Sequence, residues 1–296
     1  MGSTLRLVAL LTLLTMVLLL GGGLVGGISG AMIALALAVI LDASAYWFSD
    51  RLILRMTGAS EISASDAPDL YRMVEGLARA AGIPTPRLYV IESVTPNAFA
   101  TGRDPAHAAI ALTAGIVSAL GAEELAAVLA HEIAHIRGRD TLLSSVVASL
   151  AGAVTVLATL APASLLAGRS RDDEAEDDDR GRTDRVLAGA AAVILAPVAA
   201  ALIQGAISRA REYEADSAGA QILGDPLPLA SAIEKLDAAN REAPLDTSPA
   251  LAHQFVVQPF VARGLASLFQ THPPVDERVA RLRSLALHGA FSPVRF

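Results

Sequence analysis

Two histidines and a glutamate in the stretch AVLAHEIAHIRGRD have the types and the spacing of a metal-binding group that activates water. His131 and His135 are four residues apart, so on a helix they lie one turn apart on the same face. Two imidazole nitrogens placed in this way can bind one zinc ion. Glu132 stands next to that face, where it can accept a proton from the attacking water and pass it to a leaving amine.

A catalytic zinc ion needs a third protein ligand, and the chain has no cysteine to supply it. The stretch SRAREYEADSAGA offers Glu212 and, four residues later, Asp216 on the same helix face. Glu212 can bind the metal while Asp216 accepts a hydrogen bond from the far nitrogen of a histidine ligand. Glu214 is the competing ligand, but it lies about 200° round the helix from Glu212. An ordinary charged helix surface is the alternative interpretation of this stretch.

The elements that must position these groups indicate a mainly helical α+β fold with a small sheet. The segment 122–138 is rich in Ala, Leu and Glu and ends at a glycine, so we expect the HEIAH motif to lie on a helix. An earlier helix can be capped by Asp66 and ended by Gly82. The segments between these helices that alternate or are rich in β-forming residues predict short strands at 87–93, 97–102 and 107–115.

The composition indicates membrane segments in addition to this domain. Hydrophobic residues make up 53% of the 296 residues and charged residues only 18%. Each of four apolar runs has about the 20 residues that a spanning helix needs. A signal peptide with Arg6 as its basic start is the alternative for the first run, and buried core helices are the alternative for the last two. The runs are 5–23, 28–47, 142–166 and 186–207.

These runs divide the chain into four parts. Residues 1–49 are expected to form a transmembrane hairpin, and residues 50–140 the first half of a catalytic domain. Residues 141–207 form a second apolar hairpin whose tip is an acidic loop, 169–185, and residues 208–296 supply the second half of the domain.

The distribution of basic residues predicts the orientation of these hairpins. Arginines flank the first hairpin and precede the third apolar run, whereas the uncharged connector GGGLVGGISG has none. The positive-inside rule then places the HEIAH segment in the cytoplasm of a multi-pass cell-membrane protein. The formal net charge is −7, without a basic stripe, which excludes nucleic acid as an expected partner. The arginines are Arg6, Arg51, Arg55, Arg137 and Arg139.

The motifs HEIAHIRGRD, SRAREYEAD and THPPVDERVARL, in this order, resemble those of the HtpX-type membrane zinc endopeptidases, relatives of the CAAX prenyl endopeptidases. The resemblance extends over nearly the whole chain and implies a gluzincin-like catalytic domain with one zinc ion per chain. It implies that His131 and His135 are ligands, that Glu132 is the catalytic base and that Glu212 is the third ligand. It also implies polypeptide substrates and the lipid bilayer as partners.

Two further predictions depend on the same resemblance. The stretch TPNAFATGR would provide an edge strand beside the cleft, where Asn97, Ala98, Phe99 and Ala100 bind a peptide through main-chain hydrogen bonds. An edge of the sheet without a binding role is the alternative. His272, in THPP, would lie near the zinc ion and hydrogen-bond the oxyanion of the tetrahedral intermediate, unless it simply ends a loop.

The resulting hypothesis is a membrane-bound zinc-dependent endopeptidase that hydrolyses misfolded or membrane proteins at the cytoplasmic face, in protein quality control. One alternative is a non-catalytic zinc-binding membrane scaffold, and another is a CAAX-type prenyl-protein endopeptidase. Intramembrane proteolysis is disfavoured because charged residues flank the HEIAH helix closely. The sequence does not determine the oligomeric state. His107, His253 and His288 have no partner at a useful spacing and receive no role.

Overall fold

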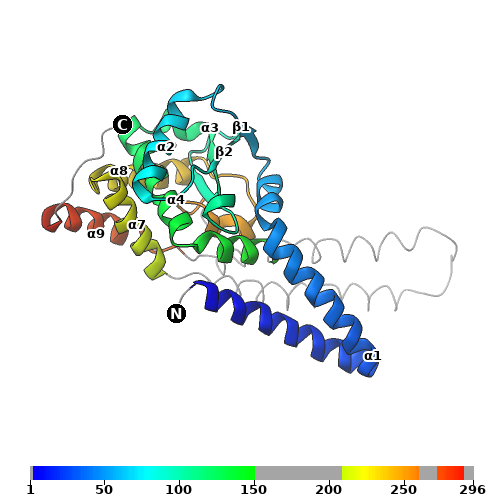
Figure 1. Ribbon diagram of the computed structural model, residues 1–296. Coiled ribbons are helices and arrows are strands. Elements are labelled where there is room, and N and C mark those ends of the chain that lie inside the picture. Colours follow the sequence, from blue (N-terminus) through cyan, green and yellow to red (C-terminus); the bar gives the residue numbers. More distant parts are fainter. Residues whose placement is uncertain (1–2, 151–208, 260–271, 290–296) are drawn as a thin grey trace, which may run out of the picture.

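The computed structural model describes residues 3–150, 209–259 and 272–289 (Figure 1). Helix α1 (Ser3–Met56) is a hairpin of two antiparallel arms, drawn in blue. The chain turns at Gly26 and Gly27, where the backbone leaves helical geometry and Gly27 adopts a φ of +59°. Glycine reaches this conformation without the steric cost that a side chain would add.

Within the described residues, the segment Gly26–Met56 is the one helix that is long and apolar enough to cross a membrane. Its large apolar side chains point outward, and Ile28, for example, is 83% exposed. Exposed apolar side chains along a helix long enough to span a bilayer are typical of a segment in contact with lipid. Of the predicted third run, only the beginning is described, within the helix Asp140–Leu150. The predicted fourth run, at 186–207, lies outside the described residues.

The sheet has four strands, β1 (Ser60–Ile62), β2 (Arg87–Ile91), β3 (Ala98–Thr101) and β4 (Ala109–Thr113). Their order is β1-β2-β4-β3, with β2 and β4 parallel and both outer strands antiparallel to their neighbours. The three predicted strands are confirmed as β2, β3 and β4, whereas β1 was not predicted. Strand β3 therefore forms one edge of the sheet.

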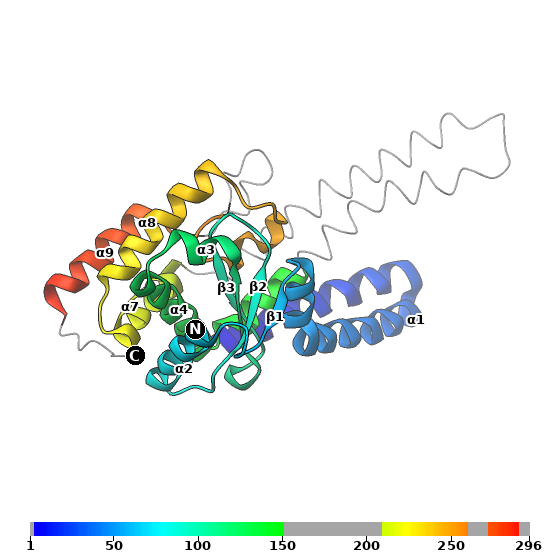
Figure 2. The same cartoon turned by 90° about the horizontal axis from the view of Figure 1, so that it is seen from above.

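A few of the remaining helices contact this sheet and the others pack against one another beside it, so the expectation of a mainly helical fold with a small sheet is confirmed. Figure 2 shows the three C-terminal α-helices of the described residues, coloured yellow to red, on the side of the sheet away from the α1 hairpin. The α-helices are α2 (Pro68–Ala81), α3 (Ala114–Ala119), α4 (Ala122–Arg137), α7 (Arg209–Leu223), α8 (Leu227–Glu242) and α9 (Val275–His288), and the 3-10 helices are η1 (Pro105–His107) and η2 (Pro249–Gln254).

Helix α4 lies at the centre of the domain and confirms the helix predicted at 122–138. It packs against α2, α7, α8 and β3. Gly219 allows α7 to approach closely, since a Cβ atom at that position would lie only 2.9 Å from the Cα atom of His131. This approach brings the two halves of the domain, far apart in sequence, into contact at the HEIAH motif.

The start of α2 differs from the prediction. Its first residue is Pro68, and its N-cap residue, Ala67, has no capping side chain. Asp66 instead accepts hydrogen bonds from the backbone and the hydroxyl of Ser63, because it belongs to the preceding turn. The predicted end is confirmed, since Gly82 adopts the left-handed conformation with a φ of +70°.

The open end of the α1 hairpin packs against the helix Asp140–Leu150, which follows α4. Leu7 and Ala45, one from each arm, pack in an apolar cluster with Leu143, Val146 and Val147. The hairpin is thereby anchored to the same region of the chain that carries the HEIAH motif. The division of the chain into four parts stays a prediction, because most of the second apolar hairpin lies outside the described residues.

Candidate metal centre

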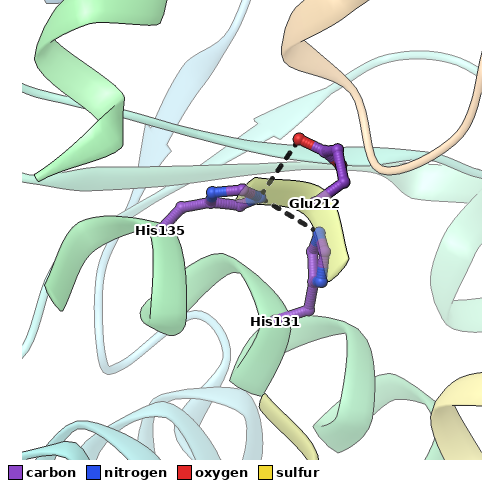
Figure 3. Close-up of side chains that lie close together, drawn as sticks. All are labelled: His131, His135 and Glu212. Carbon is purple, nitrogen blue, oxygen red and sulfur yellow. Dashed lines mark hydrogen bonds and ion pairs between the residues drawn. The ribbon is translucent and has the colours of Figure 1, made fainter. Parts of the chain in front are cut away.

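Three side chains from helices α4 and α7 converge on one point, as Figure 3 shows. The Nε2 atoms of His131 and His135 lie 3.2 Å apart, and His135 Nε2 lies 3.7 Å from Glu212 Oε1. One ligand atom from each residue falls within 4.8 Å of the others. Two nitrogens and a carboxylate oxygen in this arrangement can hold one divalent metal ion.

The other ring nitrogen of each histidine faces away from this point, toward a carboxylate. His131 Nδ1 lies 3.0 Å from Asp216 Oδ1, and His135 Nδ1 lies 3.5 Å from Asp140 Oδ2. A carboxylate at Nδ1 favours the tautomer whose Nε2 lone pair is free for a metal. The orientation of both rings therefore fits a metal site, beyond the mere presence of two histidines.

Asp216 is held in turn by an arginine that sequence analysis did not identify. Arg278 donates to both carboxylate oxygens of Asp216, at 2.9 and 2.7 Å, and its side chain is 1% exposed. Burial alone would raise the pKa of Asp216, but the Arg278 guanidinium outweighs it and holds the pKa at about 2. Asp216 is therefore a carboxylate at any pH near neutrality.

A sequence signal for Arg278 does exist. The buried residues of α9 are Arg278, Val279 and Leu282, with Val275 also packed against the core. Positions 275, 278, 279 and 282 follow the spacing of the apolar face of an amphipathic helix. An arginine in that series marks a charged group turned toward the interior, where it requires a partner.

The surroundings of the site favour a positive charge. Burial alone would lower the pKa of His135, but Asp140 and Glu212 raise it to about 9. The same carboxylates would stabilise a metal cation at this point. Glu214, the competing third ligand, is exposed on the opposite side of α7, and the structure brings Glu212 to the histidines.

Glu132 is buried beside the two histidines and lines the same cavity. Burial raises the pKa of its carboxyl group to about 7, although a hydrogen bond with the backbone of Ala100 works in the opposite direction. A carboxyl group with a pKa near neutrality is suited to take up and release a proton. Its position and its pKa both fit the predicted general base.

His272 also lies near the site. Its Nδ1 atom is 3.7 Å from Glu212 Oε2, and its side chain is 8% exposed. Its Nδ1 atom therefore faces the Glu212 carboxylate, and among the described residues its Nε2 atom has no hydrogen-bond partner. A buried imidazole that is held through one nitrogen and has no partner at the other can donate a hydrogen bond to a ligand in the site.

His253, to which the sequence assigned no role, lines the cavity as well. Its Nε2 atom lies 3.3 Å from the carbonyl oxygen of Ser144. His107 and His288 are exposed and bond locally, to Asp104 and to Ser284. His253 was missed because it comes from η2, a short element with no spacing pattern.

The cavity itself is small, with a volume of about 30 Å³. A single water molecule needs roughly 10–15 Å³ of such space, so the described residues leave room beside the histidines for a metal ion and a water molecule. The predicted peptide-binding residues, Asn97 to Ala100, are buried, and only Ala100 lines the cavity. Its lining residues are Ala100, His131, Glu132, His135, Asp140, Thr141, Ser144, Glu212, His253, Gln254 and Phe255.

Comparison with known proteins agrees with this geometry. Residues 64–286 match peptidase family M48. A protein from Syntrophobacter fumaroxidans named "Protease HtpX homolog" is 48% identical over 286 residues, which cover 96% of this chain and 100% of the relative. A protein of the same name from Ralstonia pickettii is 46% identical over 292 residues, 98% of either chain.

A crystal structure of Ste24p from S. mikatae is a more distant match, with 18% sequence identity and a TM-score of 0.46. The match covers 85% of this chain and 57% of that chain. The residues that match the family M48 model, 64–286, include the HEIAH motif, Glu212 and Arg278. The chain belongs to peptidase family M48 and is a membrane-associated metallopeptidase.

Proposed function

We propose that this protein is a zinc endopeptidase in which His131, His135 and Glu212 bind one zinc ion per chain. The observation that carries the proposal is the convergence of the three ligand atoms within 4.8 Å, in a cavity that also contains the buried carboxyl group of Glu132. The domain is gluzincin-like in this proposal, since the third ligand is a glutamate on a second helix.

The zinc ion would supply a Lewis acid that polarises the scissile carbonyl and makes a water molecule easier to deprotonate. Glu132 takes the proton from that water and delivers it to the leaving amine. Asp216 and Arg278 keep the His131 ring in its metal-binding orientation. His272, whose Nε2 atom has no hydrogen-bond partner among the described residues, donates a hydrogen bond to the oxyanion.

The substrates proposed are misfolded or membrane proteins, as expected of quality control. Strand β3 is an edge strand that reaches the cavity at Ala100. Pairing with an edge strand recognises the peptide main chain and places few demands on side chains, which suits an enzyme that must accept many sequences. The membrane topology proposed is multi-pass, with four spanning segments and the domain at the cytoplasmic face of the cell membrane.

The test uses the full chain, purified in detergent without metal and reloaded with zinc. We expect the natural sequence to cleave casein and Glu132→Gln to bind zinc but to lose cleavage by roughly 100-fold or more, because the general base is gone. Undiminished cleavage by Glu132→Gln would contradict the role assigned to Glu132. Zinc binding without turnover in the natural sequence would support the non-catalytic scaffold.

The role of His272 needs a separate variant, since loss of activity alone could reflect loss of zinc. We expect His272→Gln to retain zinc and to lower kcat more than it raises KM, because an oxyanion contact strengthens in the transition state. A change in KM alone would contradict the assignment.

A further inference from the structure

The outer edge of strand β3 is already paired, by a segment of the same chain. This cover segment, Gln254–Val257, follows η2. The backbone N–H of Val256 donates to the carbonyl oxygen of Ala98 at 3.0 Å, and Phe255 forms an antiparallel bridge with Phe99. The rings of the two phenylalanines meet edge to face, with centroids 5.3 Å apart. The cover segment therefore lies where a peptide would pair with β3.

Two carbonyl groups of the cover segment accept hydrogen bonds from buried side chains. Arg278 Nη1 donates to the carbonyl oxygen of Val256 at 2.6 Å, and Asn97 Nδ2 donates to that of Val257 at 3.0 Å. Arg278 is the same residue that holds Asp216 behind His131. Arg278 thus connects the main chain of the cover segment to Asp216, the carboxylate beside the metal ligand His131.

The rest of the edge is closed too. The backbone of Ala100 is hydrogen-bonded with the carboxyl group of Glu132, and the carbonyl oxygen of Gly102 accepts a hydrogen bond from the hydroxyl of Thr141 at 2.9 Å. The cavity between the cover segment and the histidines has a volume of about 30 Å³. A peptide cannot pair with this edge of β3 while the cover segment occupies it.

We propose that the structure shows a closed state of the enzyme in which the cover segment occupies the position of the substrate strand. A peptide displaces Gln254–Val257 and takes over its contacts with Ala98, Asn97 and Arg278. This proposal rests on the proposed function, because it assumes that the cavity is the site of cleavage.

Replacement of the cover segment by a peptide predicts a preference for unfolded substrates. The peptide replaces main-chain hydrogen bonds with equivalent ones, so the remaining cost is removing Phe255, Val256 and Val257 from the interior, where each is at most 2% exposed. A peptide recovers this cost best when it places a bulky apolar side chain where the Phe255 ring lies against Phe99. Unfolded chains expose such side chains and folded proteins bury them, so the cover segment selects for unfolded substrates.

A reversible lock on the cover segment tests the proposal. Because Phe99 faces Phe255 in an antiparallel bridge, Ala98 lies opposite Val256, and both side chains belong to one apolar cluster. Opposite residues with a hydrogen-bonded pairing have Cα atoms about 5.5 Å apart, within the ~4.4–6.8 Å range that a disulfide spans. The chain contains no cysteine of its own, so Ala98→Cys/Val256→Cys introduces one defined pair.

We expect the oxidised double variant to keep its zinc and to cleave casein at least about tenfold more slowly than after reduction, because its open state is removed. The single variants Ala98→Cys and Val256→Cys, treated in the same way, should not respond to reductant. Equal cleavage by the oxidised and reduced forms, with the disulfide verified by mass spectrometry, would overturn the proposal.

A second measurement is independent of turnover. In Glu132→Gln/Val256→Cys, the thiol is buried while the cover segment is in place, so a maleimide reagent labels it only when the segment leaves. We expect a saturating casein peptide to accelerate labelling several-fold. A rate that the peptide leaves unchanged or lowers would overturn the displacement. Failure of the natural sequence to cleave casein would instead refute the proposed function, and the labelling result would still show whether a peptide moves the segment.

Discussion

Replacing Asp216 by Asn tests whether the metal site depends on its buried support. The carboxylate of Asp216 lies 3.0 Å from His131 Nδ1 and accepts two hydrogen bonds from Arg278. Asn preserves the shape and one acceptor oxygen but removes the charge. The histidine ligand becomes less basic, and the buried guanidinium of Arg278 loses its counter-charge.

The burial and the partners of Asp216 indicate how large both effects should be. Loss of a hydrogen-bonded partner of a metal ligand typically weakens metal affinity about 10–100-fold, or roughly 1.4–2.7 kcal/mol. The side chains of Asp216 and Arg278 are only 4% and 1% exposed, so solvent cannot replace the pair. Breaking such a buried pair on one side costs about 3–5 kcal/mol of stability. In Asp216→Asn, the metal-free protein should lose the stability of the buried pair. The zinc-loaded protein should lose this stability and, in addition, the free energy of zinc binding that corresponds to the weaker affinity.

The assay combines zinc competition against a chelating indicator with thermal unfolding in detergent, each with and without zinc. Asp237→Asn is a matched control, since Asp237 pairs with Arg241 on the surface of α8 at 2.8 Å. An exposed pair of this kind contributes at most about 1 kcal/mol, and it is not in contact with the site. A zinc affinity for Asp216→Asn within about twofold of the natural value would refute the support role.

Other substitutions test the closeness of α4 and α7 and the burial of the general base. Gly219→Ala places a methyl group 2.9 Å from the backbone of His131, so thermal unfolding should show a loss of about 1–3 kcal/mol of stability, and zinc binding should weaken. At an ordinary helix position the same change would stabilise the protein by up to about 1 kcal/mol. Stabilisation by Gly219→Ala would therefore contradict the close approach of α7 to α4. Burial raises the pKa of Glu132 to about 7, so the folded metal-free protein binds a proton more tightly than the unfolded chain and loses stability as pH rises from about 4.5 to 7. The advantage in stability of metal-free Glu132→Gln over the natural sequence should therefore grow between pH 5 and pH 8, by an amount on the order of 2–3 kcal/mol, and a pH-independent difference in urea unfolding would contradict it.

The local parts of the site could be predicted from the sequence because they depend on helix geometry alone. His131 and His135 share a face through their spacing, and Glu212 and Asp216 do so in the same way. The preference for Glu212 over Glu214 follows from the same geometry, and the structure agrees, with Glu214 exposed. Strands β2, β3 and β4 carried enough β-forming residues to be recognised.

What joins these local parts could not be predicted, because it depends on contacts between segments distant in sequence. The approach of α7 to α4 depends on a single glycine, Gly219, whose missing side chain carries no signal in one sequence. The pairing of Phe255 with Phe99 joins segments more than 150 residues apart. The family resemblance implied an edge strand at 97–102 that a peptide could pair with, and the structure shows that edge paired with Gln254–Val257. Native proteins commonly protect an edge strand in this way.

The Asp216–Arg278 pair is better explained by orientation of the site than by stability of the fold, and a double variant separates the two. Replacing a buried ion pair as a whole by apolar residues of similar volume is often neutral or stabilising, whereas breaking it on one side is costly. We therefore expect metal-free Asp216→Leu/Arg278→Met to unfold at a temperature near that of the natural protein and well above that of Asp216→Asn. Zinc affinity should remain at least about tenfold below the natural value, because His131 still lacks its carboxylate. If the double variant regained zinc affinity together with stability, the pair would serve packing alone.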